Sequence, residues 1–99
     1  MYEKCDALLQ MEQLFLQEGF FDEEPHPCRV IFCDREAERI HLISTEAKLP
    51  RFSLDAAYLC QIETEEASVF CRGTIVERYE NKAGKVVVFA IKNGFYKNV

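Results

Sequence analysis

The chain has 99 residues, enough for one domain that buries its own core without disulfides or metals. Hydrophobic residues make up 48% of it and charged residues 29%, the balance of a soluble globular domain rather than of a disordered or membrane-spanning chain. The net charge is −5, and most of the acidity precedes residue 51: residues 1–50 carry 5 Lys and Arg against 11 Asp and Glu. Nucleic-acid binding depends on clustered cations, so the composition argues against that partner.

The apolar runs are far shorter than the roughly 20 residues that a membrane span requires. No basic segment followed by an apolar one, the mark of a secretory signal, is visible at the start. We therefore expect a cytoplasmic protein without membrane contact. Its five cysteines are odd in number and, in the cytosol, are expected to stay reduced.

The first predicted element is an amphipathic helix. Residues 3–17 lack Gly and Pro and are rich in helix formers. Gly19, Pro25 and Pro27 then end the helix. Phe20 and Phe21 are expected to anchor its end, so that residues 1–21 form the helical part. The apolar face of this helix would consist of Cys5, Leu8, Leu9, Met11, Leu14, Phe15 and Leu16.

Two strands are predicted next. Residues 28–33 are β-branched and aromatic, as in a strand that is covered on both faces. Residues 34–38 form a charged connection, and residues 39–44 form a second strand. Leu49 and Pro50 begin a loop, because Pro50 cannot donate to a central ladder.

A hairpin is predicted over residues 58–72. Residues 58–62 and 69–72 are strand-like and are joined by the loop of residues 64–67. If Ile62 lies opposite Val69, Cys60 lies opposite Cys71. A redox switch at this cysteine pair would require exposed thiols with one thiolate favoured by nearby cations; small buried hydrophobic side chains are the alternative.

A second hairpin is predicted over residues 74–91, with residues 81–84 as its turn. If Glu80 faces Lys85, then Val76 faces Phe89 and Thr74 faces Ile91. Both faces of this ribbon are then partly apolar. We therefore expect one face to line the barrel interior and the helix to cover the other. Asn93 and Gly94 are expected to close the last strand, which leaves Phe95, Tyr96 and Val99 as an exposed or docking tail.

The predicted fold class is α+β, mainly β. A small antiparallel β-barrel of about five to six strands occupies residues 28–97, and an N-terminal amphipathic helix occupies residues 1–21. The whole of residues 1–99 is expected to form a single domain.

The short strands and the R-x-x-x-R spacing of residues 35–39 resemble the PilZ family and the related barrel of bacterial flagellar-brake proteins. The resemblance implies a barrel that binds the second messenger cyclic di-GMP, with Arg35 and Arg39 on the phosphates and guanine, or a companion module to a binding domain. The family's D/N-x-S-x-x-G turn is missing between Phe52 and Gly73, and acidic residues adjoin the arginine pair. The resemblance therefore favours a companion barrel in second-messenger signalling.

Catalytic and metal-binding alternatives rest on few residues. His26, Cys28 and Cys33 are possible metal ligands, but their spacing matches no standard zinc pattern. His41 could pair with Cys33 or Cys60 as a nucleophile, without local motif support. Glu65 and Glu66 fall in a hairpin tip, where carboxylates stay solvated, and the four glycines are isolated. We therefore expect no enzyme, no cofactor and no metal.

Two functions remain open. The first is a non-enzymatic interaction or regulatory module, which uses the helix to bind a protein partner or a second copy. The second is a barrel that binds a nucleotide such as cyclic di-GMP, or single-stranded nucleic acid. Interface candidates are Leu8, Met11, Phe15, Tyr79, Phe95 and Tyr96. Ligand-binding candidates are Arg35, Arg39, Arg72 and Arg78.

Overall fold

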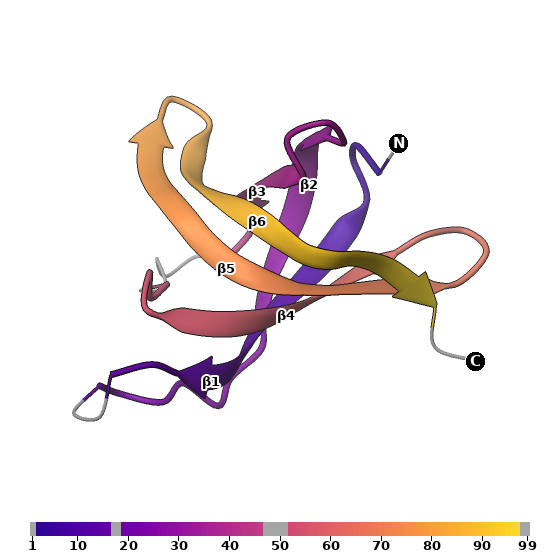
Figure 1. Ribbon diagram of the computed structural model, residues 1–99. Helices are drawn as coiled ribbons and strands as arrows, with labels where there is room; N and C mark the ends of the chain where they lie inside the picture. The colour runs from indigo at the N-terminus through magenta and orange to yellow at the C-terminus, as the bar shows by residue number, and fades with distance from the viewer. Residues whose placement is uncertain (1, 17–18, 47–51, 98–99) are drawn as a thin grey trace.

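The structure is a closed antiparallel β-barrel (Figure 1). It is a computed structural model that describes residues 2–16, 19–46 and 52–97. The strands follow one another around the barrel in the order β1-β2-β3-β6-β5-β4, and β4 pairs with β1 to close the ring. The six strands are β1 (Asp6–Leu14), β2 (His26–Asp34), β3 (Arg39–Ser44), β4 (Ala56–Glu63), β5 (Ser68–Asn81) and β6 (Gly84–Lys97).

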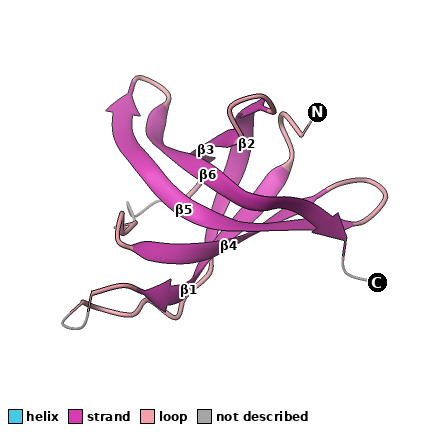
Figure 2. Ribbon diagram, viewed as in Figure 1, coloured by secondary structure: helices cyan, strands magenta, loops and turns pink. Residues whose placement is uncertain are grey.

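The described residues contain strands, turns and loops but no helix (Figure 2). Accordingly, no helix that could span a bilayer is found among them. The strands predicted over residues 28–33 and 39–44 are confirmed within β2 and β3. Of the charged residues predicted to connect them, Asp34 ends β2, and residues 35–38 form the connection. The predictions at Leu49, Pro50 and Val99 lie outside the described residues.

The helix predicted over residues 1–21 is wrong, because β1 occupies the centre of that segment. Ala7, Leu9 and Met11 alternate into the barrel and are 3%, 0% and 4% exposed. This period of two is the pattern of a strand with one buried face. The pairing of β1 with both β2 and β4 outweighs the helix propensity of its leucines, glutamines and glutamate.

The β4–β5 hairpin has the predicted register. Ile62 lies opposite Val69, and Cys60 lies opposite Cys71. The turn is held by Thr64, whose hydroxyl donates to the carbonyl of Ala67 at 2.6 Å. The long-range alignment of the two cysteines therefore follows from a local turn.

The β5–β6 hairpin departs from the predicted register beyond its turn. Glu80 faces Lys85 as predicted. The register then shifts between Ile75 and Glu77, so Ile75 rather than Val76 lies opposite Phe89. Val76 is the extra residue of this β-bulge, and its side chain is 47% exposed.

The last strand does not end at Asn93 and Gly94. Both residues have positive φ, 70° and 75°, and they lie within β6 where the register between Phe70 and Arg72 shifts. The strand then continues to Lys97. The prediction of an exposed or docking tail at Phe95 and Tyr96 is therefore wrong, because both residues belong to the paired strand β6.

The core fills the barrel interior with apolar side chains from all six strands. The largest side chains with less than 2% exposure are Tyr58 and Phe89. Val86 and Val88 on the outer face of β6 are also buried. Instead of a helix, their cross-strand neighbours flank them: His41 and Glu77 lie opposite Val88, and Ile43 and Tyr79 lie opposite Val86.

Candidate functional site

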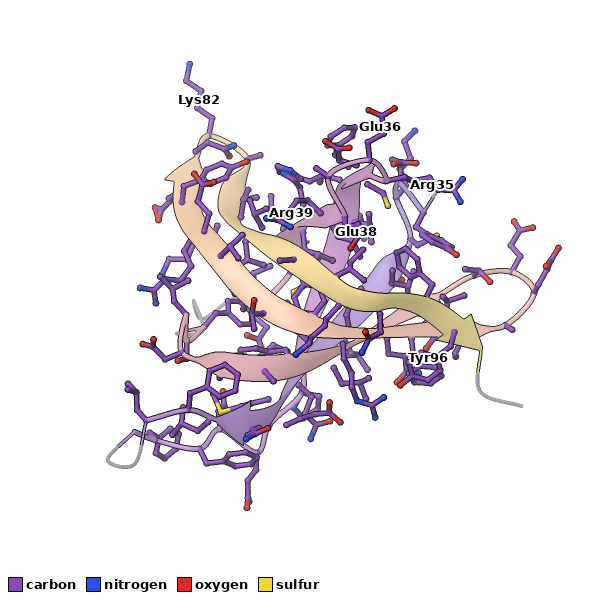
Figure 3. The ribbon with its side chains drawn as sticks, viewed as in Figure 1. Arg35, Glu36, Glu38, Arg39, Lys82 and Tyr96 are labelled. Carbon is purple, nitrogen blue, oxygen red and sulfur yellow. The ribbon has the colours of Figure 1, made fainter. Side chains whose placement is uncertain are left out.

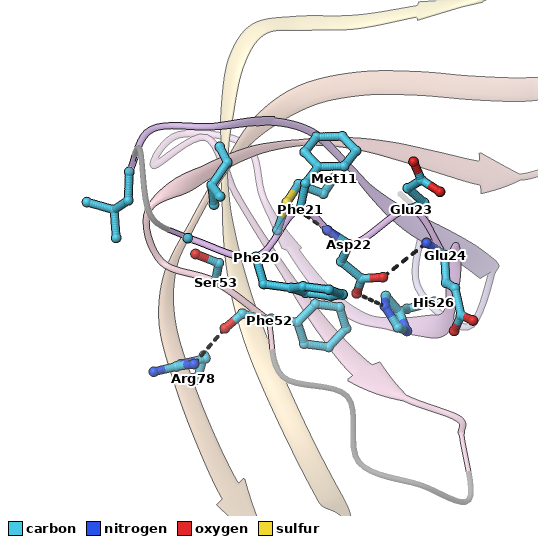
Figure 4. Close-up of a pocket in the computed structure, with 13 residues that line it drawn as sticks. Met11, Phe20, Phe21, Asp22, Glu23, Glu24, His26, Phe52, Ser53 and Arg78 are labelled. Carbon is cyan, nitrogen blue, oxygen red and sulfur yellow. Dashed lines mark hydrogen bonds and ion pairs between the residues drawn. The ribbon is translucent and has the colours of Figure 1, made fainter.

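A cavity of about 930 Å³ opens at one end of the barrel (Figure 4). Because neighbouring strands are antiparallel, the β1–β2, β3–β4 and β5–β6 connections all lie at this end of the barrel. The walls come chiefly from the last residues of β1 and from the connection that follows it. The lining residues used below are Met11, Leu16, Phe20, Phe21, Asp22, Glu23, Glu24, His26, Phe52 and Arg78.

The cavity is partly lined by a charged cluster around His26. This side chain is the first of β2 and is 7% exposed. Its Nε2 lies 2.5 Å from Asp22 Oδ2 in the β1–β2 connection. Its Nδ1 lies 3.1 Å from Glu46 Oε2, just beyond the end of β3. One imidazole therefore links two separate connections.

The geometry favours the protonated form of His26. Each ring nitrogen faces a carboxylate oxygen, and only the imidazolium can donate from both nitrogens. Burial lowers the pKa of His26, but the hydrogen bonds to Asp22 and Glu46 outweigh it and raise the pKa above its ordinary value. For the carboxyl of Asp22, burial raises the pKa. Its hydrogen bond to His26 outweighs burial, so the pKa of Asp22 lies below its ordinary value. Because both nitrogens are engaged, the cluster is suited to joining loops.

The aromatic side chains of the β1–β2 connection point into water at the cavity rim. Phe20 is 83% exposed and Phe21 is 43% exposed. The prediction that these two residues anchor a helix end to the body is therefore wrong. Phe15 and Leu16 from the same connection are 55% and 54% exposed. We call Phe15, Leu16, Phe20 and Phe21 the loop surface.

Hydrogen bonds to other elements hold the loop surface in place. The amide of Phe15 donates to the carbonyl of Asp55 at 2.9 Å. The Gln10 side chain donates to the carbonyl of Glu23 at 3.1 Å. The Asp22 carboxylate accepts from the amide of Glu24 at 3.0 Å in addition to binding His26. The exposed aromatic rings are thus carried by a connection that is tied down on both sides.

The predicted ligand-binding arginines are distributed over both ends of the barrel. Arg35 lies in the β2–β3 turn, at the end opposite the cavity, and Figure 3 shows it there beside Glu36. Arg39 donates to the carbonyl of Ala37 in the same turn at 3.1 Å. Arg78 lines the cavity and donates to the carbonyl of Phe52 at 2.6 Å.

Arg72, the fourth of these arginines, lies on the outer surface in a group of its own. It forms an ion pair with Glu12 at 2.7 Å. Its guanidinium also lies over the ring of Tyr96, 5.5 Å from the centroid, and that ring stacks on Phe70 at 5.8 Å. The contacts of Arg39, Arg72 and Arg78 therefore involve three different segments rather than one shared site.

The predicted interface residues have different surroundings. Phe15 belongs to the loop surface, and Met11 is buried but lines the cavity. Phe95 packs against the core, with its ring 4.9 Å from that of Tyr2. Leu8 is half-buried, and Tyr79 and Tyr96 are about 40% exposed on β5 and β6: 39% and 41%.

Four of the five cysteines are buried, and burial raises the pKa of the Cys28, Cys33 and Cys60 thiols. Cys60 and Cys71 are 0% exposed, and the hydrogen bond with Cys71 together with burial raises the pKa of Cys60. Burial raises the pKa of Cys28 to about 12. No group of three or more His, Cys, Asp or Glu side chains that could hold a metal is found among the described residues.

Sequence reasoning missed the two features that define this end of the barrel. Phe20 and Phe21 were assigned to a helix terminus, and Glu46 was not connected with His26. A usable signal was present for the first feature: a run of aromatic and acidic residues between predicted elements is typical of an exposed connection. The second feature needed the register of β2 against β3, which pairs Cys28 with Ser44 and so brings Glu46 to His26.

Comparisons with protein-family models, with curated proteins and with solved structures found no match for this chain. The described strands form a six-stranded, closed antiparallel β-barrel, and the comparisons assign it to no family. Its candidate site is the cavity end with the loop surface.

Proposed function

We propose that this barrel is a non-enzymatic interaction module that binds a protein partner through the loop surface. The observation that carries this proposal is the exposure of the Phe20 ring, 83%, beside a cavity. Water-exposed aromatic rings next to a concave surface are typical of protein interfaces. The hydrogen bonds at Phe15 and Glu23 reduce the ordering cost of binding, because the connection is already positioned.

Site-specific photo-cross-linking in the native cell tests the proposal. A photoreactive phenylalanine analogue replaces Phe20 in one variant of the full chain and Phe32 in a control; Phe32 is also exposed, 50%, but lies on β2. We expect a discrete cross-linked protein from position 20 that disappears when Phe21→Ser is added. Absence of a cross-link at position 20, or the same product from position 32, would contradict the proposal.

A second candidate is a ligand-binding barrel for a nucleotide such as cyclic di-GMP or for single-stranded nucleic acid. The group of Arg72, Tyr96 and Phe70 supports it, since guanidinium and aromatic planes stack on bases. The ion pair with Glu12 opposes an anionic ligand there. Titration with cyclic di-GMP and with short oligonucleotides tests this candidate: saturable binding that is lost on Arg72→Ala would favour it, and retention after that change would point to Arg35 and Arg39.

The resemblance to the companion barrels of PilZ-type proteins is compatible with the first proposal. A companion barrel works by contact with another domain or protein, and the described strands of this chain form a closed barrel. Under this proposal the module would act in second-messenger signalling in the cytoplasm. A partner identified by the cross-link at Phe20 would show whether that setting applies.

A further inference from the structure

The β1–β2 connection carries acidic side chains next to the loop surface. The β1–β2 connection, residues 15–25, contains four acidic residues and no Lys or Arg. The β3–β4 connection, residues 45–55, contains two acidic and two basic residues and is neutral by sequence. By sequence, the two connections together therefore have a net negative charge, in keeping with a chain whose acidity is concentrated before residue 51.

The described carboxylates of this connection divide into two groups. Asp22 is engaged with His26, whose other ring nitrogen is bound by Glu46 of the β3–β4 connection. The remaining two carboxylates are those of Glu23 and Glu24. Glu23 and Glu24 line the cavity and are exposed; among the described residues, neither carboxylate has an ion-pair or hydrogen-bond partner. Two carboxylates at the rim are thus available to a partner, next to Phe20 and Phe21.

Among the described residues, the cationic groups that line the cavity, His26 and Arg78, do not cancel this charge. The positive charge of His26 is shared between two carboxylates, so that group of three keeps a net negative charge. Arg78 donates to the neutral carbonyl of Phe52 and so keeps its single positive charge, which is smaller than the combined charge of Glu23 and Glu24. An acidic or phosphorylated partner would meet Glu23 and Glu24 as like charges, which is unfavourable at a desolvated interface.

Resting on the proposed function, we propose that the partner's docking segment is basic and apolar: a peptide segment with Lys or Arg next to bulky hydrophobic side chains. The hydrophobic side chains occupy the cavity between Phe20 and Phe52, and the cations bind Glu23 and Glu24. Lys and Arg next to the exposed Phe20 ring also gain cation–π attraction. The charge of the surface thereby selects among apolar partners.

A second copy of this chain fits the surface less well, because two loop surfaces that meet face to face bring Glu23 and Glu24 together with their own counterparts. An anionic membrane would be repelled by the same carboxylates. Both alternatives are outcomes of the experiment below.

The experiment uses the full chain and three synthetic, dye-labelled peptides of equal length. The first alternates Leu and Phe with Lys. The second replaces each Lys by Glu, and the third replaces each Leu and Phe by Ser. We expect fluorescence anisotropy to show saturable binding of the first peptide. The other two peptides should bind at least about tenfold more weakly. Added salt should weaken binding of the first peptide.

Four variants locate the binding. Phe20→Ser and Glu23→Lys should each lower the affinity for the first peptide about fivefold or more. Their matched controls, Phe32→Ser and Glu65→Lys, change exposed residues that do not line the cavity and should leave binding unchanged. All four positions are exposed, so the fold should persist, and thermal unfolding verifies it.

The outcomes separate the partner class from the proposed function. If the Glu peptide binds as well as the Lys peptide and both depend on Phe20, the loop surface binds partners but the basic class is wrong. If the Lys peptide does not bind, or if the controls weaken it equally, the inference is overturned, while the cross-link from Phe20 still decides the proposed function. A concentration-dependent dimer in light scattering, or binding to anionic vesicles, that is lost on Phe20→Ser would also overturn it.

Discussion

His26 links the β1–β2 and β3–β4 connections through its charge. Its raised pKa means that His26 binds its proton more tightly in the folded state than in the unfolded chain. The stabilisation is therefore complete below the ordinary histidine pKa, about 6.5, and is lost as the pH rises through the raised pKa. Asp22 acts oppositely, because its lowered pKa makes its contribution disappear only as the pH falls.

The first prediction concerns this pH dependence. We expect the free energy of unfolding, from urea titrations between about pH 5 and pH 9, to fall as His26 loses its proton, and His26→Gln to remove that fall. His41→Gln is the control, since His41 is the other histidine of the chain and contacts Phe32 instead of carboxylates. An unchanged pH profile in His26→Gln would contradict the role of the cluster.

A second prediction at the residue scale concerns the thiols. Cys5 is half-buried, whereas the other four cysteines are buried. Because a thiol must be accessible and deprotonated to react, Cys5 should react first with a disulfide reagent in the native protein. Cys60 and Cys71 should react only on unfolding, in contrast to a redox switch. Mass spectrometry of partly labelled protein identifies the site, and rapid native labelling of Cys60 would contradict the buried pair.

At the scale of the elements, β5 and β6 approach each other closely at Gly73. A Cβ at this position would lie 1.9 Å from the carbonyl oxygen of Ala90, a backbone atom that cannot rotate away. At Gly94, whose φ is 75°, a Cβ would meet no atom within 4 Å. The first glycine is required by packing between strands and the second by backbone conformation alone.

These two glycines provide a third prediction. Gly73→Ala should lower the free energy of unfolding by more than the roughly 1–3 kcal/mol of an overpacked core position, because the strands themselves must separate. Gly94→Ala should cost about 1–2 kcal/mol, the penalty of a left-handed conformation for a residue with a Cβ. Urea unfolding of both variants measures the difference. An equal cost at the two positions would contradict the close approach at Gly73.

How well an element could be predicted depends on whether the interactions that fix it are close or distant in the sequence. The β4–β5 hairpin was predicted down to the pairing of Cys60 with Cys71, because a short turn fixes its register. The β5–β6 register failed at Val76, where a bulge leaves no mark in the residue pattern. At the candidate site, the fit of Asp22 and Glu46 around His26 depends on two connections that the sequence does not relate.

At the scale of the whole molecule, β1 is the strand that closes the barrel. It pairs with β2 on one side and with β4 on the other, although β4 begins more than 40 residues later in the chain. The helix prediction failed because propensity is a local property, whereas this closure is a non-local one. Without β1, the edges of β2 and β4 would be unpaired, and such edges promote aggregation.

The last prediction tests this closure with two neighbouring leucines. Leu9 is 0% exposed in the barrel interior, whereas Leu8 is half-buried and lies on the outer face. Leu9→Ala should therefore lower the free energy of unfolding of the entire barrel by about 2–5 kcal/mol, and Leu8→Ala by clearly less. In the amphipathic helix both leucines would share the apolar face and cost about the same. Unequal losses in urea unfolding, with β1 amides protected from hydrogen exchange to the same extent as those of β2 and β4, would establish β1 as an integral strand.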